Sequence, residues 1–152
     1  MSFKKTKQAY AEKQRVSSCT ACFPEDERFT ESELREFFEN SNNCVALLWD
    51  CNEMIGFSIA RPVSEILPER VDELDTYNIT TTEIHPEYQG RGYVGLLMHM
   101  LENELKNRGV RYIERNAKVG NGYGEKVAKQ YVGRIVQAGE PRKTKFGIQQ
   151  FF

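Results

Sequence analysis

The sequence predicts an α/β (α+β) fold in which helices flank a central mixed sheet. The chain has 152 residues, about the size of one compact domain, and 39% of them are hydrophobic, which is enough for a buried core. Patterns typical of helices come first, followed by three strands, a helix, a strand, a helix and two strands. We therefore expect a single domain over residues 1–152.

The N-terminal segment, residues 1–28, is predicted to be atypical and helical, with a polar helix over about 4–15. A second helix is predicted to start at Thr30, because Glu33 three residues later completes a capping box. The apolar stripe of this helix consists of Leu34, Phe37 and Phe38.

Three strands are predicted in the middle of the chain. An apolar run over 44–49 indicates the first strand, and the run over 54–60 indicates its antiparallel partner across a turn. Residues 77–84 are rich in β-branched side chains and form the third predicted strand. The connection over 61–75 is polar and acidic and contains two prolines.

An amphipathic helix is predicted from about Arg91 to Lys106, and Gly109 is placed to cap its end. The side chains expected on one face of it are Tyr93, Leu97, Met100, Leu101 and Leu105. The elements predicted next are a short strand at 111–113, a Gly-rich loop at 120–124, a helix to about Tyr131, and strands near 134–136 and 146–152.

Charge is unevenly distributed along the chain, although the net charge is only −1. Residues 106–152 contain 11 basic and 3 acidic side chains, and residues 1–105 contain 10 basic and 19 acidic ones. The basic third could face phosphates of a cofactor or a nucleic acid, and the acidic part would favour a cationic ligand. Ordinary solvated faces would explain the same charges equally well.

The expected compartment is the cytoplasm. No apolar run approaches the roughly 20 residues that cross a bilayer, and the N-terminus lacks the apolar stretch of a signal peptide. We therefore expect no membrane association.

The four cysteines are predicted to be free thiols and not metal ligands. Cys19 and Cys22 form one C-x-x-C pair, but six residues separate Cys44 from Cys51, which is a poor spacing for a zinc site. No other metal site is predicted.

The segment from Thr80 to Leu97 carries the strongest functional pattern. It joins a strand, a short loop with two close glycines and the start of an amphipathic helix. Glycines remove side chains where a backbone must approach a ligand, and a first helical turn offers unpaired N–H groups. Such a site binds phosphate.

The run I-H-P-E-Y-Q-G-R-G, from Ile84 to Gly92, resembles the acetyl-CoA-binding signature of the GNAT N-acetyltransferases. In that family V-x-P ends a central strand and Q/R-x-x-G-x-G/A begins the next helix. The order of elements agrees over 44–152. The resemblance implies a GNAT-like, mostly antiparallel central sheet, acetyl-CoA as the cofactor, and acetyl transfer to a primary amine. Val94 stands where a small residue is usual, and the helical segment 1–28 stands where the family has its first strand.

The resemblance also assigns cofactor-binding residues. The backbone N–H groups of Ile84 and His85 would face the thioester carbonyl, as an oxyanion hole does. Asn116 would contact the pantetheine arm. The residues that would hold the pyrophosphate are Gln89, Gly90, Arg91, Gly92, Tyr93 and Val94, with Gly95 directly after them.

A tyrosine on the later helix is the usual acid for the leaving thiolate in this family. Tyr131 is the closer match to that tyrosine, and Tyr123 is its competitor. Core packing is the alternative role for either one.

The general base is sought near the end of the third strand. Asn78 occupies the position of the base in some relatives and cannot take a proton, which leaves Glu83 and His85 as the nearby candidates. Alternation along a strand sends both to the face opposite Thr82 and Ile84. A structural role for each, a water chain or an already neutral amine are the alternatives.

The substrate class rests on charge. The family's acceptor pocket is expected to border the 61–75 connection, and the carboxylates there would suit a cationic amine. They are Glu65, Glu69, Asp72, Glu73 and Asp75. A lysine side chain, a polyamine, an aminoglycoside or a protein N-terminus would all fit, and a homodimer is as compatible with the sequence as a monomer.

Two other functions compete. Gly90-x-Gly92-x-x-Gly95 matches the dinucleotide fingerprint, with Glu114 19 residues beyond it, but five residues separate the strand from the first glycine. The second alternative is a binding module, holding CoA without catalysis or binding nucleic acid. The lack of the aromatic pattern of RNA-binding modules argues against nucleic acid.

Overall fold

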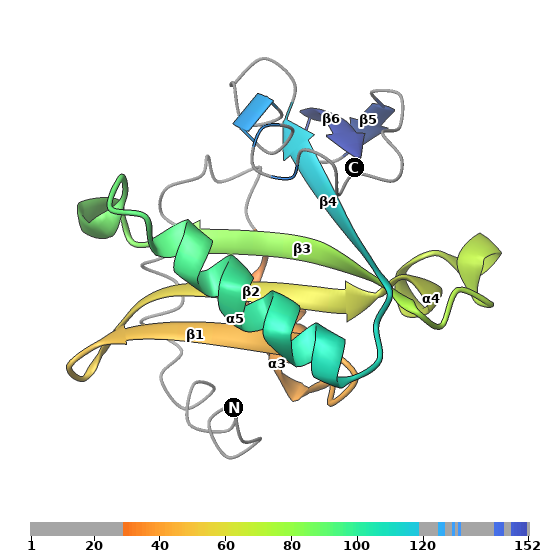
Figure 1. The fold of residues 1–152 in the computed structure, drawn as a ribbon, viewed down its shortest axis with the longest axis horizontal. Helices are drawn as coiled ribbons and strands as arrows, with labels where there is room; N and C mark the ends of the chain where they lie inside the picture. The colour runs from red at the N-terminus through yellow and green to blue at the C-terminus, as the bar shows by residue number, and fades with distance from the viewer. Residues whose placement is uncertain are drawn as a thin grey trace. The chain divides into compact units, whose positions relative to one another are not determined.

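The computed structural model describes residues 29–118, 125–126, 129, 131, 142–144 and 147–151. Two compact units make up the chain, Met1–Ile113 and Glu114–Phe152. The order in the first unit is α3 (Glu31–Glu39), β1 (Cys44–Asp50), β2 (Glu53–Pro62), α4 (Val63–Ile66), η2 (Pro68–Arg70), β3 (Thr76–Ile84), η3 (Pro86–Tyr88) and α5 (Tyr93–Asn107) (Figure 1). One domain over residues 1–152 stays a prediction.

Helix α3 begins where the capping box predicts. The Glu33 N–H donates to the Thr30 hydroxyl oxygen at 3.2 Å, and the Thr30 N–H donates to the Glu33 carboxylate at 2.8 Å. The predicted stripe of Leu34, Phe37 and Phe38 is buried in a cluster with Leu47, Met54, Phe57 and Ile59 of the sheet. The helix and its buried face are therefore confirmed.

Strands β1, β2 and β3 form an antiparallel sheet, in which Cys44 faces Ala60 and Gly56 faces Ile84. The predicted hairpin of two antiparallel strands and the predicted third strand are confirmed. The strand ends differ from the predicted ones by one or two residues. Cys51 adopts a φ of 51° in the turn between β1 and β2, which lets this short turn reverse the chain.

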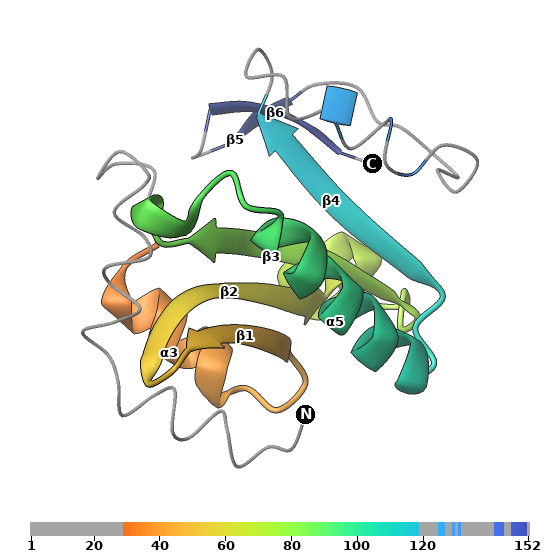
Figure 2. The same cartoon turned by 60° about the vertical axis from the view of Figure 1, so that its left-hand side comes forward.

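Helix α5 covers the face of this sheet opposite to α3 (Figures 1 and 2). Its buried side chains are Leu97, Met98, Leu101 and Leu105. They pack in one cluster with Cys44, Ala46, Ala60, Ile79 and Ile84. The helix starts at Tyr93, two residues later than predicted, because Gly92 adopts a left-handed conformation and caps it. Gly109 follows its C-terminus with a φ of 79°, as predicted.

Gly56 in β2 allows the sheet and α5 to approach closely. A Cβ built there would lie 2.6 Å from Ile84 Cδ1, 3.0 Å from the Glu83 carbonyl oxygen and 3.5 Å from Leu97 Cδ1. The first distance is one that real Cβ atoms essentially never show and the second is tighter than most Cβ contacts, so packing here requires Ile84 to shift for any residue other than glycine. Nothing in the local sequence indicates this requirement.

We expect Gly56→Ala to lower the free energy of unfolding by about 1–3 kcal/mol, because the added methyl overpacks a buried contact. Gly95→Ala is the matched control, since a Cβ at Gly95 meets nothing within 4 Å and the position is helical. It should raise the free energy of unfolding by about 0.5 kcal/mol through helix propensity. Urea titration measures both, and shifts of the same sign would contradict the packing argument.

The connection between β2 and β3 contains two short helices, α4 and η2, that the sequence did not predict. Neither is long enough to show helical periodicity. The side-chain amides of Asn40 and Asn42 donate to the Glu65 carboxylate at 3.0 and 2.6 Å, and Arg70 pairs with Glu73. Two carboxylates of this acidic segment, those of Glu65 and Glu73, are thus bound by other side chains.

The second unit contains β6 (Gly147–Phe151), which pairs antiparallel with both β4 (Tyr112–Lys118) and β5 (Arg142–Thr144). Strand β4 crosses the unit boundary and is longer than the predicted 111–113, because it continues through charged residues that the prediction treated as its end. Strand β6 lies within the predicted 146–152, and β5 was not predicted.

Several predicted elements lie outside the described residues: the helix over 4–15, the Gly-rich loop at 120–124 and the strand near 134–136. Of the helix ending near Tyr131, residues 125, 126 and 129 are described and helical. Within the described part of the chain, no helix has the length and apolar character needed to cross a membrane.

Candidate active site

The turn between β3 and α5 gathers the backbone amides of the predicted phosphate-binding motif. Gly90 and Gly92 have φ values of 74° and 82°, a region that other residues rarely adopt. Gly92 is the N-cap of α5, and no side chain caps the first turn of the helix. The amides of that turn therefore keep their hydrogen-bonding capacity for a ligand.

The same turn has an open face. A Cβ built at Gly90, Gly92 or Gly95 meets no atom of the described residues within 4 Å, apart from chain neighbours and the backbone of its own helix. Among the described residues, no backbone carbonyl accepts from the N–H of Gly90, Arg91 or Gly92. Val94 and Arg91 are exposed and leave the turn uncovered. An anionic group can therefore approach these amides at the positive end of the α5 dipole.

Gln89 and His85 fix the turn to the sheet. The Gln89 side-chain amide donates to the Ile84 carbonyl oxygen at 3.1 Å, and the His85 N–H donates to the Ile55 carbonyl oxygen at 2.7 Å. Both bonds connect the loop to strand ends. The loop is thus anchored on its inner side while its glycines stay accessible.

The bond from His85 to Ile55 bears on one prediction. The His85 N–H already donates within the sheet, so facing a thioester carbonyl would require this bond to be replaced, and the assignment of the His85 amide stays a prediction. The imidazole is also engaged, since Nδ1 accepts the Glu87 N–H at 3.3 Å and caps η3. This supports a structural role for His85 over that of a base. The assignment for Ile84 stays a prediction.

A β-bulge in β3 was missed by the sequence analysis. Ile59 faces Thr81 and Ala60 faces Ile79, so Thr80 is an extra residue in the pairing of β2 with β3. Bulges re-aim the backbone and often lie next to active sites. A run of three threonines gives no indication of which residue is extra, so no signal in the sequence could have located it.

Glu83 lies on the α3 face of β3 and is 3% exposed. Its Oε1 accepts the Thr81 hydroxyl at 2.9 Å. Thr82 lies on the other face, where its hydroxyl is 2.7 Å from that of Ser58, as strand alternation predicts. Glu83 is thus a buried carboxylate beside the bulge, and it stays a candidate base.

Tyr131 lies in the second unit, where Arg115 of β4 contacts it. Arg115 is 7% exposed, its Nη1 donates to Tyr131 Oη at 3.4 Å, and its Cζ lies 5.7 Å from the ring centre. A phenol that accepts from a guanidinium keeps its own hydrogen for another acceptor, and the cation stabilises the oxygen once that proton has left. Sequence reasoning did not select Arg115, because a single charged strand residue resembles a solvated one.

Asn116 follows Arg115 on β4 and faces Phe151 of β6 in the strand register. Its predicted contact with the pantetheine arm stays a prediction. Tyr123, the competitor of Tyr131, lies outside the described residues.

A model of the acetyltransferase (GNAT) family matches residues 12–130. The chain belongs to the GNAT acetyltransferase family. The predicted family, the α/β fold with a mostly antiparallel sheet flanked by helices, and the expectation of an acetyl-CoA-dependent acetyltransferase are confirmed at this level. The dinucleotide alternative was wrong, because the glycine pattern belongs to a family with another chemistry.

Solved structures of GNAT enzymes share the fold of this acetyltransferase. The ribosomal-protein-S18-alanine N-acetyltransferase from Escherichia coli has a TM-score of 0.63 at 19% identity, over 99% of this chain and 86% of that one. A ribosomal-protein-alanine N-acetyltransferase from Brucella melitensis has a TM-score of 0.67 at 14% identity, over 99% and 94% of the two chains. The paia N-acetyltransferase from Thermoplasma acidophilum, solved with coenzyme A, has a TM-score of 0.61 at 12% identity, over 99% and 94%. No curated protein matches the sequence.

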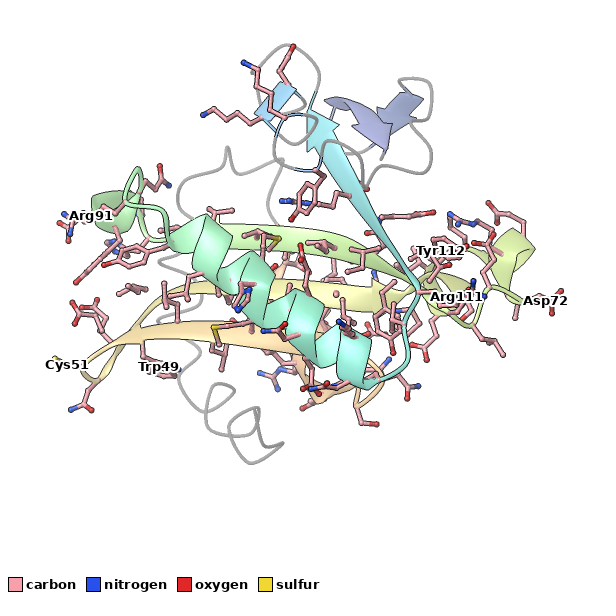
Figure 3. The ribbon with its side chains drawn as sticks, in the orientation of Figure 1. Trp49, Cys51, Asp72, Arg91, Arg111 and Tyr112 are labelled. Atoms are coloured by element: carbon pink, nitrogen blue, oxygen red, sulfur yellow. The ribbon has the colours of Figure 1, made fainter. Side chains whose placement is uncertain are left out.

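The acidic connection of this acetyltransferase lies far from its Gly-rich turn. The connection precedes β3 and the turn follows it, so the nine residues of β3, about 26 Å at 3.3 Å per residue, separate them. Figure 3 shows Asp72 and Arg91 at opposite ends of the first unit. The turn is the expected pyrophosphate site and not the acceptor site, so the expectation that these carboxylates border the acceptor pocket stays a prediction.

The two cysteines of the acetyltransferase that the structure describes, Cys44 and Cys51, are also far apart. Cys44 is buried at the start of β1, where burial raises the pKa of its thiol to about 11, and Cys51 is exposed beyond the other end of the strand. They lie at opposite ends of the seven-residue strand β1, which is about 20 Å long, so these two cannot ligate one ion. No group of three potential metal ligands occurs in the described residues. Cys19 and Cys22 lie outside them.

Proposed function

We propose that this protein transfers an acetyl group from acetyl-CoA to a primary amine, with the cofactor's pyrophosphate bound at the turn between β3 and α5. The observation that carries the proposal is the set of uncapped amides at the start of α5. They combine positive φ at Gly90 and Gly92, open space beside both, and the positive end of a 15-residue helix. This chemistry fits a diphosphate.

The reaction forms an N–C bond and breaks a C–S bond, so the protein must take a proton from the amine and give one to the sulfur. Bound acetyl-CoA supplies the activated acetyl group. Tyr131 Oη holds the proton for the sulfur, and Arg115 stabilises the phenolate that is left. Glu83, buried beside the bulge at Thr80, is the candidate acceptor for the amine proton.

The acceptor in this proposal is a primary amine, on a protein or a small molecule. Similar structures include ribosomal-protein-alanine N-acetyltransferases and an aminoglycoside N-acetyltransferase, so the fold accommodates both kinds of acceptor. The carboxylates of the 61–75 connection would suit a cationic amine, but charge does not separate a protein amine from a small-molecule amine. A test must therefore span both acceptor classes.

The experiment has two steps. Calorimetry measures binding of acetyl-CoA to the full chain, and a thiol assay then follows release of CoA with a panel of an alanine-terminated peptide, a lysine peptide, a polyamine and an aminoglycoside. We expect binding, and amine-dependent thiol release with at least one acceptor. Binding without release in any arm would leave a CoA-binding module, and absence of binding would refute the proposal.

A further inference from the structure

Tyr88 connects the turn between β1 and β2 to the Gly-rich turn. Its hydroxyl donates to Asp50 Oδ2 at 3.0 Å, and its N–H donates to the His85 carbonyl oxygen at 2.8 Å. Its ring centre lies 5.4 Å from the guanidinium carbon of Arg91 and 6.3 Å from the ring centre of Tyr93. One half-buried side chain thus contacts the hairpin turn, the glycine loop and the first turn of α5.

We propose that Tyr88 is a positioning residue of the pyrophosphate site, and that Asp50 acts on this site through the Tyr88 hydroxyl. The inference rests on the proposed function, because it concerns the same turn. Figure 3 shows Arg91 and Cys51, the residue next to Asp50, at the same end of the first unit.

The loop needs such a support because its own residues supply little packing. Gly90 and Gly92 have no side chains, and in the described part of the chain no atom beyond their chain neighbours lies within 4 Å of a Cβ built at either position. Two glycines also give a free loop many conformations, and ordering them on binding costs affinity. The Gln89 bond to β3 fixes one side of the loop. On the other side of the loop, the Tyr88 ring is held by its hydroxyl and packs against the Arg91 side chain. The Arg91 cation can bind a phosphate there.

Charge and positioning predict opposite effects for Asp50. Asp50 is an exposed carboxylate near a proposed anion site, so by charge alone its removal would tighten binding of acetyl-CoA. As the acceptor for Tyr88, its removal would weaken binding, because the ring loses its anchor. The hydrogen bond to Asp50 raises the pKa of Tyr88 above its ordinary value, so the hydroxyl stays a donor at neutral pH.

The test compares Asp50→Ala, Tyr88→Phe and the double variant with the parent. Tyr88→Phe keeps the ring under Arg91 and removes only the anchor. We expect each single variant to raise the Kd for acetyl-CoA by about 3- to 10-fold, the range for the loss of one typical hydrogen bond. The KM for acetyl-CoA should rise equally with kcat unchanged, and the double variant should bind no more weakly than either single one.

Glu53→Ala is the matched control. Glu53 faces Asp50 across the same turn and is exposed. Like Asp50, it places a negative charge near the Tyr88 hydroxyl. Its removal should leave binding unchanged or slightly tighter. Unchanged or tighter binding in Asp50→Ala, or additive losses of affinity in the double variant, would overturn the positioning role and leave the proposed function standing. A parent that binds no acetyl-CoA would overturn this inference together with the proposed function.

Discussion

Gly92→Glu is expected to abolish binding of acetyl-CoA, with an affinity loss of about 100-fold or more, since like charges placed together cost several kcal/mol. The new carboxylate would stand at the N-cap of α5, where no atom of the described residues, the chain neighbours apart, lies within 4 Å of a Cβ built at Gly92. It would compete with the pyrophosphate for the same amides and repel it. Calorimetry with acetyl-CoA measures the loss.

Gly109→Glu is the control, because Gly109 also has positive φ, 79° against 82°, and open space at its Cβ position. Both variants carry the cost of a left-handed side chain, about 1–2 kcal/mol. A carboxylate suits the N-terminus of α5 and opposes the dipole at its C-terminus. Gly92→Glu should therefore be the more stable of the two and the one that fails to bind. Normal affinity in Gly92→Glu would place the cofactor elsewhere.

Tyr131→Phe is expected to lower kcat by about 100-fold or more, the usual contribution of a positioned general acid. The Kd for acetyl-CoA should hardly change, because the hydroxyl would act on charge that develops only during reaction. Steady-state kinetics with the amine that the panel identifies, together with calorimetry, separates the two quantities. The hydrogen bond from the Arg115 guanidinium should be lost in the same variant, since phenylalanine has no oxygen to accept it, while the contact of the guanidinium with the ring should remain.

Two further tyrosines serve as comparisons for Tyr131. Tyr112 is exposed at the start of β4, and Tyr112→Phe should leave kcat unchanged. Tyr123→Phe tests the competitor. Parent-like activity of Tyr131→Phe would remove that residue from the mechanism, and a selective loss in Tyr123→Phe would transfer the role to it.

The sequence by itself determined the elements that short-range physics specifies. Thr30 and Glu33 predicted the start of α3, because a capping box involves only neighbouring residues. The apolar run at 44–49 and its partner predicted the β1–β2 hairpin, since the turn between them is local. The Gly-rich turn was likewise predictable, because glycine conformation and helix-terminal amides depend on consecutive residues.

Only the tertiary structure decided which hydrogen-bonding groups already have partners and which residues lie close together across the sheet. It placed the Ile55 carbonyl against the His85 amide, an extra residue at Thr80, and Arg115 beside Tyr131. It also placed the acidic connection at the far end of β3 from the turn. Each of these depends on register between strands or on contacts between residues distant in sequence, whereas alternation and motif spacing describe one strand or one turn at a time.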